Sequence, residues 1–447
     1  MDRDDEARIL ASIDRICVQR NDGYPESTQL ELSHRSKCER MPRRIMSTLS
    51  EIPCPTRLLR VAWLLPTIKS GYYWQPLLRD FTKMFPDTVV YTSEWTGFIC
   101  GCEDSFEVKV LPGYHHVSLK RSSAGKDIGY QGYQWVTPSV IGELRRFRPD
   151  VLFTSAFGLW TACALVYKML ARSRVIVLLD GISETTAYKK SSLRLPVRRL
   201  MGRFVDAAAS NSQAGCDYLL DVVGIQAPKI TQRVFYVPDA TVLQSEARKE
   251  TPIGTNTRPN FLFIGQLIKR KGWNYLLDAT QLLVRKGFKD FSVSVIGDGL
   301  EREQLLEQIL SRGLQNVVTF VGFVPYSSLG GYFECADVFI LPSLEDTWGM
   351  VVSEAMVFGK PILCSQYAGV KELIQSGVNG YVFDPRNPSE LAGYMERFLS
   401  NPDLIARFGA RSLELIASHT PHLAAEGLGR VAYEAFYGKN VPLTSLP

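Results

Sequence analysis

The sequence predicts an α/β protein built from two doubly wound, Rossmann-like domains. Short apolar runs alternate with amphipathic helical patterns along most of the chain, as in parallel sheets covered by helices. The chain has 447 residues, more than a single hydrophobic core usually supports. A polar stretch at 244–259, with two prolines and no periodicity, separates the alternating pattern into two halves.

These observations predict the domain boundaries. Residues 1–56 are polar and rich in Arg, Ser and Pro, so we expect a flexible N-terminal extension. The first Rossmann-like domain is expected at 57–243, the linker at 244–259 and the second Rossmann-like domain at 260–420. The remaining residues, 421–447, are expected to form a C-terminal helix and a tail.

In each domain, apolar runs bounded by turn residues predict strands, and longer amphipathic runs predict helices. The first domain is expected to contain strands at 59–65, 88–92, 106–111, 150–154, 175–179 and 234–240, and helices at 75–85, 139–147, 159–171 and 189–204. The second is expected to contain strands at 260–264, 291–296, 317–320, 338–341 and 362–364, helices at 273–286, 301–311 and 350–358, and a last helix at 423–436.

A strand, a loop and a helix meet around residues 337–361. The predicted strand ends at Pro342, and a polar loop leads through Trp348-Gly349 into the helix that begins at Met350. The free N–H groups of that helix start suit an anion such as a diphosphate. Asp346 and Glu354 flank the same place, and carboxylates accept hydrogen bonds from sugar hydroxyls. Two ordinary surface acids are the alternative reading.

A second anion site is predicted in the loop from Gly265 to Gly272. Three cations in a row, Lys269-Arg-Lys271, precede the start of a helix, which is typical of a phosphate-binding loop. The alternative is a solvated basic turn.

The stretch Pro342-Ser-Leu-Glu-Asp-Thr-Trp-Gly-Met-Val-Val-Ser-Glu-Ala-Met356 resembles the nucleotide-sugar motif of retaining glycosyltransferases of family 4. The resemblance extends from about residue 58 to the C-terminus. It implies the GT-B fold, in which two domains face a cleft and the C-terminal helix crosses back onto the first domain. It also implies a retaining, hexosyltransferase-type enzyme that moves a sugar from a nucleoside-diphosphate sugar to an acceptor in polysaccharide or glycoconjugate biosynthesis.

The resemblance assigns roles to single residues. Glu354 is implied to bind the ribose, Asp346 to face the donor sugar and Lys271 to contact the phosphates. The family has Glu where this chain has Asp346, and Arg where it has Gln266. The other implied donor contacts are Gly265, Gln266, Trp348, Gly349, Met350 and Val324, the last in a loop that meets the base through backbone groups. Ser70 and Gly71 are assigned to the acceptor side, with a simple turn at Gly71 as the alternative.

Asp180 follows the strand at 175–179, where ligands lie in doubly wound sheets. Relatives have a His near this place, and it is absent here. Asp180 is therefore either a substitute hydrogen-bond acceptor or the cap of the next segment. With Asp346 and Lys271 it completes the set of expected catalytic residues. Ser212 is expected to cap a short helix at the end of the first domain.

No metal and no cofactor other than the donor substrate are expected. No Asp-x-Asp sequence stands at a strand end, and His419 and His422 lack a third ligand at similar spacing. Gly297-Asp-Gly299 lacks the third glycine of the dinucleotide fingerprint, which counts against an NAD-dependent oxidoreductase. Two alternatives remain open: a nucleotide-sugar-binding protein that has lost catalysis, and a sugar-nucleotide epimerase of the same fold.

Composition and charge limit the classes of partner that the protein is expected to have. A net charge of +5 is small for this length, so a dedicated nucleic-acid binder is not expected. The acidic N-terminus does not resemble a signal peptide, and the cysteines are scattered, so a cytoplasmic protein is expected. The apolar run at 151–170 contains Lys168 and is explained better by a strand and a helix than by a membrane span. The acceptor is expected to be a glycan, a lipid-linked saccharide or a small molecule.

Residues Lys189–Phe204 predict a basic amphipathic helix without acids. Such a helix is typical of a peripheral contact with the inner face of a membrane. The alternative is a helix whose apolar side packs on its own domain.

Overall fold

The computed structural model describes residues 58–68, 73–121, 127–183, 187, 191, 193–247 and 259–438, with the backbone alone at 114–121, 127–134 and 245–247. The described residues belong to one compact unit. The predicted N-terminal extension, most of the predicted linker, and Ser70 and Gly71 lie outside them.

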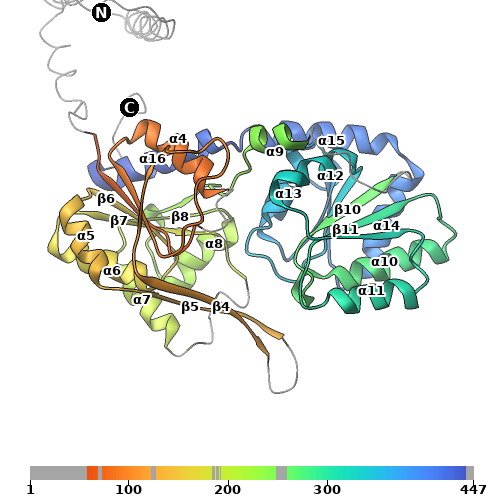
Figure 1. Cartoon of the computed structure of the whole chain (residues 1–447), viewed down its shortest axis with the longest axis horizontal. Helices are drawn as coiled ribbons and strands as arrows, with labels where there is room; N and C mark the ends of the chain where they lie inside the picture. The colour runs from red at the N-terminus through yellow and green to blue at the C-terminus, as the bar shows by residue number, and fades with distance from the viewer. Residues whose placement is uncertain are drawn as a thin grey trace, which may run out of the picture. The chain divides into compact units, whose positions relative to one another are not determined.

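The first domain is built on a seven-stranded sheet in which every pair of neighbours is parallel. Its strand order is β3-β2-β1-β6-β7-β8-β9. Figure 1 labels β6, β7 and β8 of this sheet. The strands are β1 Val61–Leu64, β2 Thr88–Thr92, β3 Glu107–Val110, β6 Val151–Ser155, β7 Arg174–Leu179, β8 Ala207–Ser210 and β9 Ile230–Gln232.

The second domain has a six-stranded, wholly parallel sheet of order β12-β11-β10-β13-β14-β15. Its strands are β10 Asn260–Ile264, β11 Ser292–Ile296, β12 Val318–Gly322, β13 Val338–Leu341, β14 Ile362–Ser365 and β15 Gly380–Phe383. In both sheets the order reverses next to the first strand, between β1 and β6 and between β10 and β13. The predicted pair of doubly wound domains is confirmed, and each has a switch point at which ligands bind in such sheets.

Helices connect the strands. Every predicted helix is present at a close position, and the structure has others that were not predicted. The helices of the first domain are α4 Trp74–Met84, α5 Ser139–Phe147, α6 Leu159–Leu170, α7 Arg194–Phe204 and α8 Gln213–Asp217. The others are α9 Ala240–Ala247, α10 Trp273–Arg285, α11 Arg302–Ser311, α12 Leu329–Cys335, α13 Met350–Val357, α14 Pro388–Ser400, α15 Asp403–Ile416 and α16 Pro421–Tyr437. The apolar run at 151–170 forms β6 and α6, as predicted, and within the described residues no helix is both long and apolar enough to cross a bilayer. As predicted, Ser212 caps α8, with its hydroxyl accepting the Gly215 amide at 3.1 Å.

An antiparallel ribbon of the first domain was not predicted. Strands β4 Gly113–Arg121 and β5 Asp127–Val136 pair with each other and with no strand of the two large sheets. Both runs mix aromatic and polar residues, so they lack the continuous apolar character of the buried parallel strands.

The predicted strand at 234–240 is wrong. The last strand of the sheet is β9, four positions earlier, and the segment after it runs without regular structure. Its backbone is held instead by the buried side chain of Asn211, whose Oδ1 accepts the amides of Phe235 and Tyr236 at 2.7 and 3.1 Å. A side-chain acceptor has replaced a neighbouring strand.

Helix α9 extends to Ala247, into the stretch predicted to be a linker. Asp239 caps it, because its Oδ1 accepts the amides of Thr241 and Val242 at 3.0 and 3.3 Å. Arg79 of α4 in turn donates to Asp239 Oδ2 at 3.2 Å. The start of the connection between the domains is thus fixed to the first domain.

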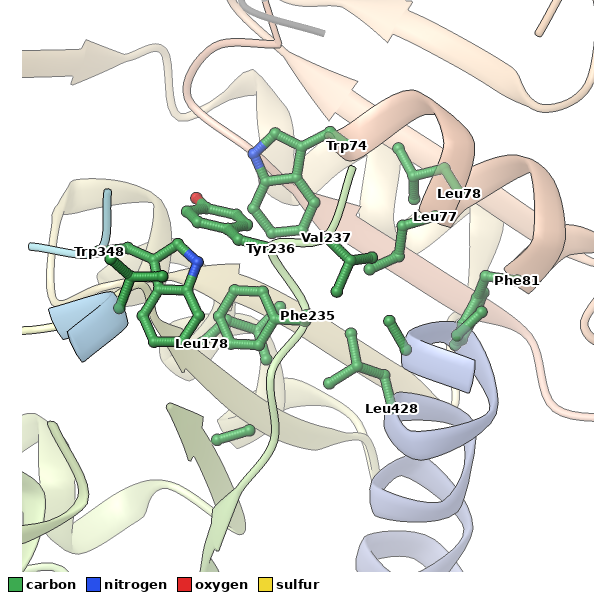
Figure 2. Close-up of a cluster of buried hydrophobic side chains, with 14 of the residues drawn as sticks. Trp74, Leu77, Leu78, Phe81, Leu178, Phe235, Tyr236, Val237, Trp348 and Leu428 are labelled. Atoms are coloured by element: carbon green, nitrogen blue, oxygen red, sulfur yellow. The ribbon is translucent and has the colours of Figure 1, made fainter. Parts of the chain in front are cut away.

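One hydrophobic core contains side chains of both domains and of the C-terminal helix. Figure 2 shows Leu178, Phe235 and Tyr236 beside Trp348, and Phe81 of α4 near Leu428 of α16. The rings of Phe85 and Tyr433 lie 5.5 Å apart, so α16 packs on the first domain. Two further cores lie within single domains, one in the second domain and one under α5, α6 and α7.

Candidate functional site

Two loops of the second domain are joined next to its switch point. One follows β10 and carries Arg270 and Lys271, and the other follows β13 and carries Glu345 and Asp346. The Arg270 carbonyl accepts the Leu344 amide at 2.8 Å, and the Arg270 guanidinium donates to the Glu345 carbonyl at 2.9 Å. Lys271 Nζ lies 2.5 Å from Asp346 Oδ2. The predicted phosphate-binding and sugar-facing residues are therefore brought together.

Gly272 allows this approach. Its φ is +70°, and a Cβ there would lie 1.9 Å from the Pro342 carbonyl oxygen. Only glycine lets the two backbones meet at this distance. Gly272 also ends the short 3-10 turn Lys269–Lys271 and begins α10.

Asp346 is held in place by its own backbone. Its amide donates to the Tyr367 carbonyl at 3.2 Å, and its carbonyl accepts the Gly369 amide at 3.2 Å. The side chains of Asp346 and Lys271 are 10% and 14% exposed. The pair is largely shielded from water, and each side chain keeps a small exposed surface.

Helix α13 begins beside this pair. Gly349 precedes it with φ +104°, a backbone conformation that side chains rarely adopt. Met350 is its first residue. The Val352 amide donates to the Gly349 carbonyl at 3.0 Å, and the amides before it have no acceptor within the helix. Trp348 is buried, and its indole N–H has no acceptor among the described residues. A preorganised set of donors thus lies at the helix start.

Glu354 lies on the first turns of α13 and is buried. Burial raises the pKa of its carboxyl to about 7, although a hydrogen bond from the Tyr326 side chain favours the charged form. Tyr326 follows the loop that contains Val324, so this loop reaches Glu354. Tyr326 was not predicted from the sequence.

Asp180 is the corresponding acid of the first domain. Burial raises the pKa of its carboxyl to about 6, and a hydrogen bond from Tyr236 counteracts this rise. Trp74 donates to the Tyr236 hydroxyl, so the three side chains form a chain of hydrogen bonds. Asp180 Oδ1 is buried and has no partner in the described part of the chain. The Oδ1 atom of Asp180 can therefore accept a hydrogen bond from a ligand.

The segments that follow β7 and β13 touch. A Cβ at Gly181 would lie 2.0 Å from the Thr347 carbonyl oxygen. Further along, both carboxylate oxygens of Glu372 accept the Gln213 amide, at 2.9 and 3.0 Å, and one also accepts from Gln232 Nε2 at 2.8 Å. Asp180 and Asp346 therefore lie on adjoining segments of the two domains.

Two further predicted donor contacts, Gly265 and Gln266, lie in the loop that follows β10. Gln266 is exposed, and Gly265 donates its amide to the Ile296 carbonyl at 3.0 Å. A Cβ at Gly297 would lie 1.9 Å from the Gly265 carbonyl oxygen. The glycines of Gly297-Asp-Gly299 are thus explained by backbone packing against this loop.

In the described part of the chain, no cluster of three His, Cys, Asp or Glu side chains could hold a metal ion. The His419 Nδ1 lies 3.2 Å from the Leu415 carbonyl oxygen, and burial lowers the pKa of its imidazole. His422 is exposed and lies 3.4 Å from Glu426 on the next turn of α16.

Sequence comparison relates the second half of the chain to known proteins. Residues 244–415 match the family model of the glycosyl transferases group 1. The match covers less than half of the chain.

The chain also has curated relatives. It is 31% identical to the alpha-D-kanosaminyltransferase of Streptomyces kanamyceticus, over 40% of this chain and 46% of that protein. It is 29% identical to the 2-deoxystreptamine N-acetyl-D-glucosaminyltransferase of Niallia circulans, over 36% of this chain and 41% of that protein. The chain spans less than half the length of these relatives.

Solved structures match almost the whole described chain. Anabaena Alr3699/HepE, determined in complex with UDP, superposes with a TM-score of 0.64 at 18% identity, covering 83% of this chain and 98% of that one. The sucrose-phosphate synthase of Thermosynechococcus elongatus superposes with a TM-score of 0.64 at 15% identity, covering 85% and 100%. These likenesses and the two parallel sheets establish the GT-B fold.

Proposed function

We propose that the protein is a retaining glycosyltransferase that moves a sugar from a nucleoside-diphosphate sugar to a glycan, a lipid-linked saccharide or a small molecule. The observation that carries the proposal is the ion pair of Lys271 with Asp346 beside the start of α13. It puts a cation, free helix amides and a carboxylate within one small, partly buried site. A diphosphate and a sugar need those groups side by side.

The donor would lie along α13. Glu354 would accept hydrogen bonds from the ribose hydroxyls, and backbone groups near Val324 would meet the base. The diphosphate would be bound by Lys271 and by the amides of Gly349 and Met350. Asp346 would accept hydrogen bonds from the sugar, and Asp180 of the first domain would face it from the other side.

The difficult step is departure of the nucleoside diphosphate, because negative charge grows on the leaving oxygen. Fixed N–H donors and a cation stabilise that charge without a metal ion, and each such donor typically contributes on the order of 3 kcal/mol. The proposed reaction is therefore metal-independent, with the donor substrate in place of a cofactor. Retention of configuration rests on the resemblance to family 4.

We also propose that the protein works in the cytoplasm, where Lys189–Phe204 makes a peripheral contact with the inner face of a membrane. The basic, acid-free character of this stretch supports the contact.

A panel of nucleotides and nucleotide sugars tests the donor site by thermal shift. A ligand at about a hundred times its dissociation constant stabilises the folded state by about 2.7 kcal/mol, a shift of several degrees. The shift should be lost in Glu354→Ala and retained in Glu303→Ala, a control at an exposed acid of α11. Failure of every nucleotide to stabilise the wild type would overturn the proposal.

Incubation of the stabilising nucleotide sugar with candidate acceptors then separates the alternatives. Transfer to an acceptor supports the enzyme. Binding with neither transfer nor hydrolysis supports a protein that has lost catalysis, a reading that Gln266 in place of the family's Arg favours. Conversion of the donor to its epimer without an acceptor supports the epimerase.

A further inference from the structure

Helix α7 turns its apolar stripe away from the protein. Leu193 is 74% exposed and Phe204 is 55% exposed. On the opposite side of the helix, Gly202 is buried, and a Cβ there would lie 2.8 Å from Val223 Cγ1. The stripe consists of Leu193, Val197, Leu200 and Phe204, at the four-three-four spacing of one helix side. The alternative left open by the sequence, an apolar side packed on its own domain, is therefore wrong for these four residues.

Helix α6 continues this surface. Both α6 and α7 cover the same face of the first sheet, since Trp160 of α6 and Met201 of α7 pack on one core (Figure 1). Lys168 Nζ donates to the Phe204 carbonyl at 2.7 Å, which joins the ends of the two helices. Toward its end, α6 exposes Val166, Met169 and Leu170, with Met169 83% exposed. Together with the α7 stripe they form what we name the α6–α7 face.

The α6–α7 face is bordered by cations. Arg203 lies on one side of the stripe and Arg194 on the other, and Arg172 follows α6. Arg199 donates to the Val222 carbonyl at 2.8 Å, so its side chain lies flat along the helix flank. The sequence has no acid from 185 to 205. The face thus combines exposed apolar side chains with a positive border.

We propose that the α6–α7 face docks on an anionic phospholipid surface. Apolar side chains would enter the region between headgroups and acyl chains, while the flanking arginines meet lipid phosphates. A second copy of the chain is a poorer occupant, because a two-fold contact would bring the arginine rows of both copies together. The inference deepens the proposed peripheral contact of Lys189–Phe204 by adding α6, and it is independent of the proposed transfer chemistry.

Vesicle co-sedimentation of the full chain tests the proposal. We expect binding to vesicles of phosphatidylcholine and phosphatidylglycerol in a ratio of about 7:3, weakening as salt is added. Binding to pure phosphatidylcholine should be much weaker. Equal binding to both vesicles, or binding to neither, would overturn the proposal.

Variants locate the contact. Arg203→Gln should weaken binding about fivefold, the equivalent of about 1 kcal/mol for one cation near the surface. Leu200→Ser combined with Phe204→Ser should weaken it further, while nucleotide binding stays unchanged. The control is Leu310→Ser on α11, because Leu310 is 67% exposed in the second domain. Wild-type vesicle binding by the double variant, or a dimer in light scattering that the double variant abolishes, would contradict a lipid partner.

Discussion

The ammonium of Lys271 lies 2.5 Å from the carboxylate of Asp346, although the two residues follow different strands, β10 and β13. Each side chain neutralises the other in the absence of a ligand. A diphosphate would draw Lys271 toward itself, and Asp346 would then be available to the sugar. The pair thereby links the two halves of the proposed donor.

Lys271→Ala should reduce kcat/KM by about 10²- to 10³-fold, because one charged donor to the leaving group is worth on the order of 3 kcal/mol. Steady-state kinetics measure the effect. Lys269→Ala is the matched control, since Lys269 is exposed on the same turn. Equal losses of kcat/KM in both variants would mean that the loop acts through its total positive charge and not through Lys271. An unchanged kcat/KM in Lys271→Ala would show that this residue has no part in the reaction.

Nucleotide affinity should fall as the pH drops below 7. In the proposed donor site the ribose hydroxyls would donate to the charged carboxylate of Glu354, whereas its pKa of about 7 leaves it increasingly protonated at lower pH. Proton competition lowers the affinity by at most about tenfold per pH unit. Calorimetric titration at several pH values measures this slope. Glu354→Gln cannot titrate and keeps only the pH dependence of the nucleotide itself, so an unchanged slope in this variant would refute the role of Glu354.

Asp180→Asn should stabilise the protein above pH 6. The folded-state pKa of about 6 is above the unfolded value, so the free energy of unfolding of the wild type falls as the pH rises from about 4 to 6. Above pH 6 this loss of stability is complete. The expected gain is about 3 kcal/mol at pH 8 and disappears toward pH 4. Denaturant titrations at both pH values measure it, with Asp221→Asn as an exposed control. A gain of the same size at both pH values would show that charge burial is not the cause.

Asn211→Ala should destabilise the first domain by about 3 kcal/mol. The substitution leaves the buried amides of Phe235 and Tyr236 without their acceptor and removes the donor to the Asp180 carbonyl, 2.8 Å away. Thermal or chemical unfolding measures the loss. Gln232→Ala, at an exposed position nearby, should cost little. If the two variants unfold alike, the segment is held by its aromatic packing instead.

The regular elements were predictable because burial on both faces of a parallel sheet leaves a plain signal in the sequence. Val338–Leu341 and Ser139–Phe147 form a strand and a helix with the bounds expected. The β4–β5 ribbon and the segment after β9 were not predictable in this way. The ribbon lacks an apolar run, and the backbone of Phe235 is fixed by Asn211, a residue distant in sequence.

The site was predictable only in part. The spacing of the two acids indicated Asp346 and Glu354, and the run of three cations indicated Lys271. Tyr326, Tyr236 and Trp74 were missed, because the hydroxyl or indole N–H that makes each contact is present in every other Tyr or Trp of the core as well. Their significance depends on the buried acids they contact, which no local pattern reveals.

The packing of α16 on α4 has a consequence for expressing the two halves of the chain as separate fragments. Phe85 has no exposed surface while Tyr433 and Gly429 lie against its ring. A polypeptide ending at 259 would keep every strand of the first sheet but would leave this aromatic surface open to water. We therefore expect a fragment with the first half of the protein to need the last helix, α16, to cover this surface.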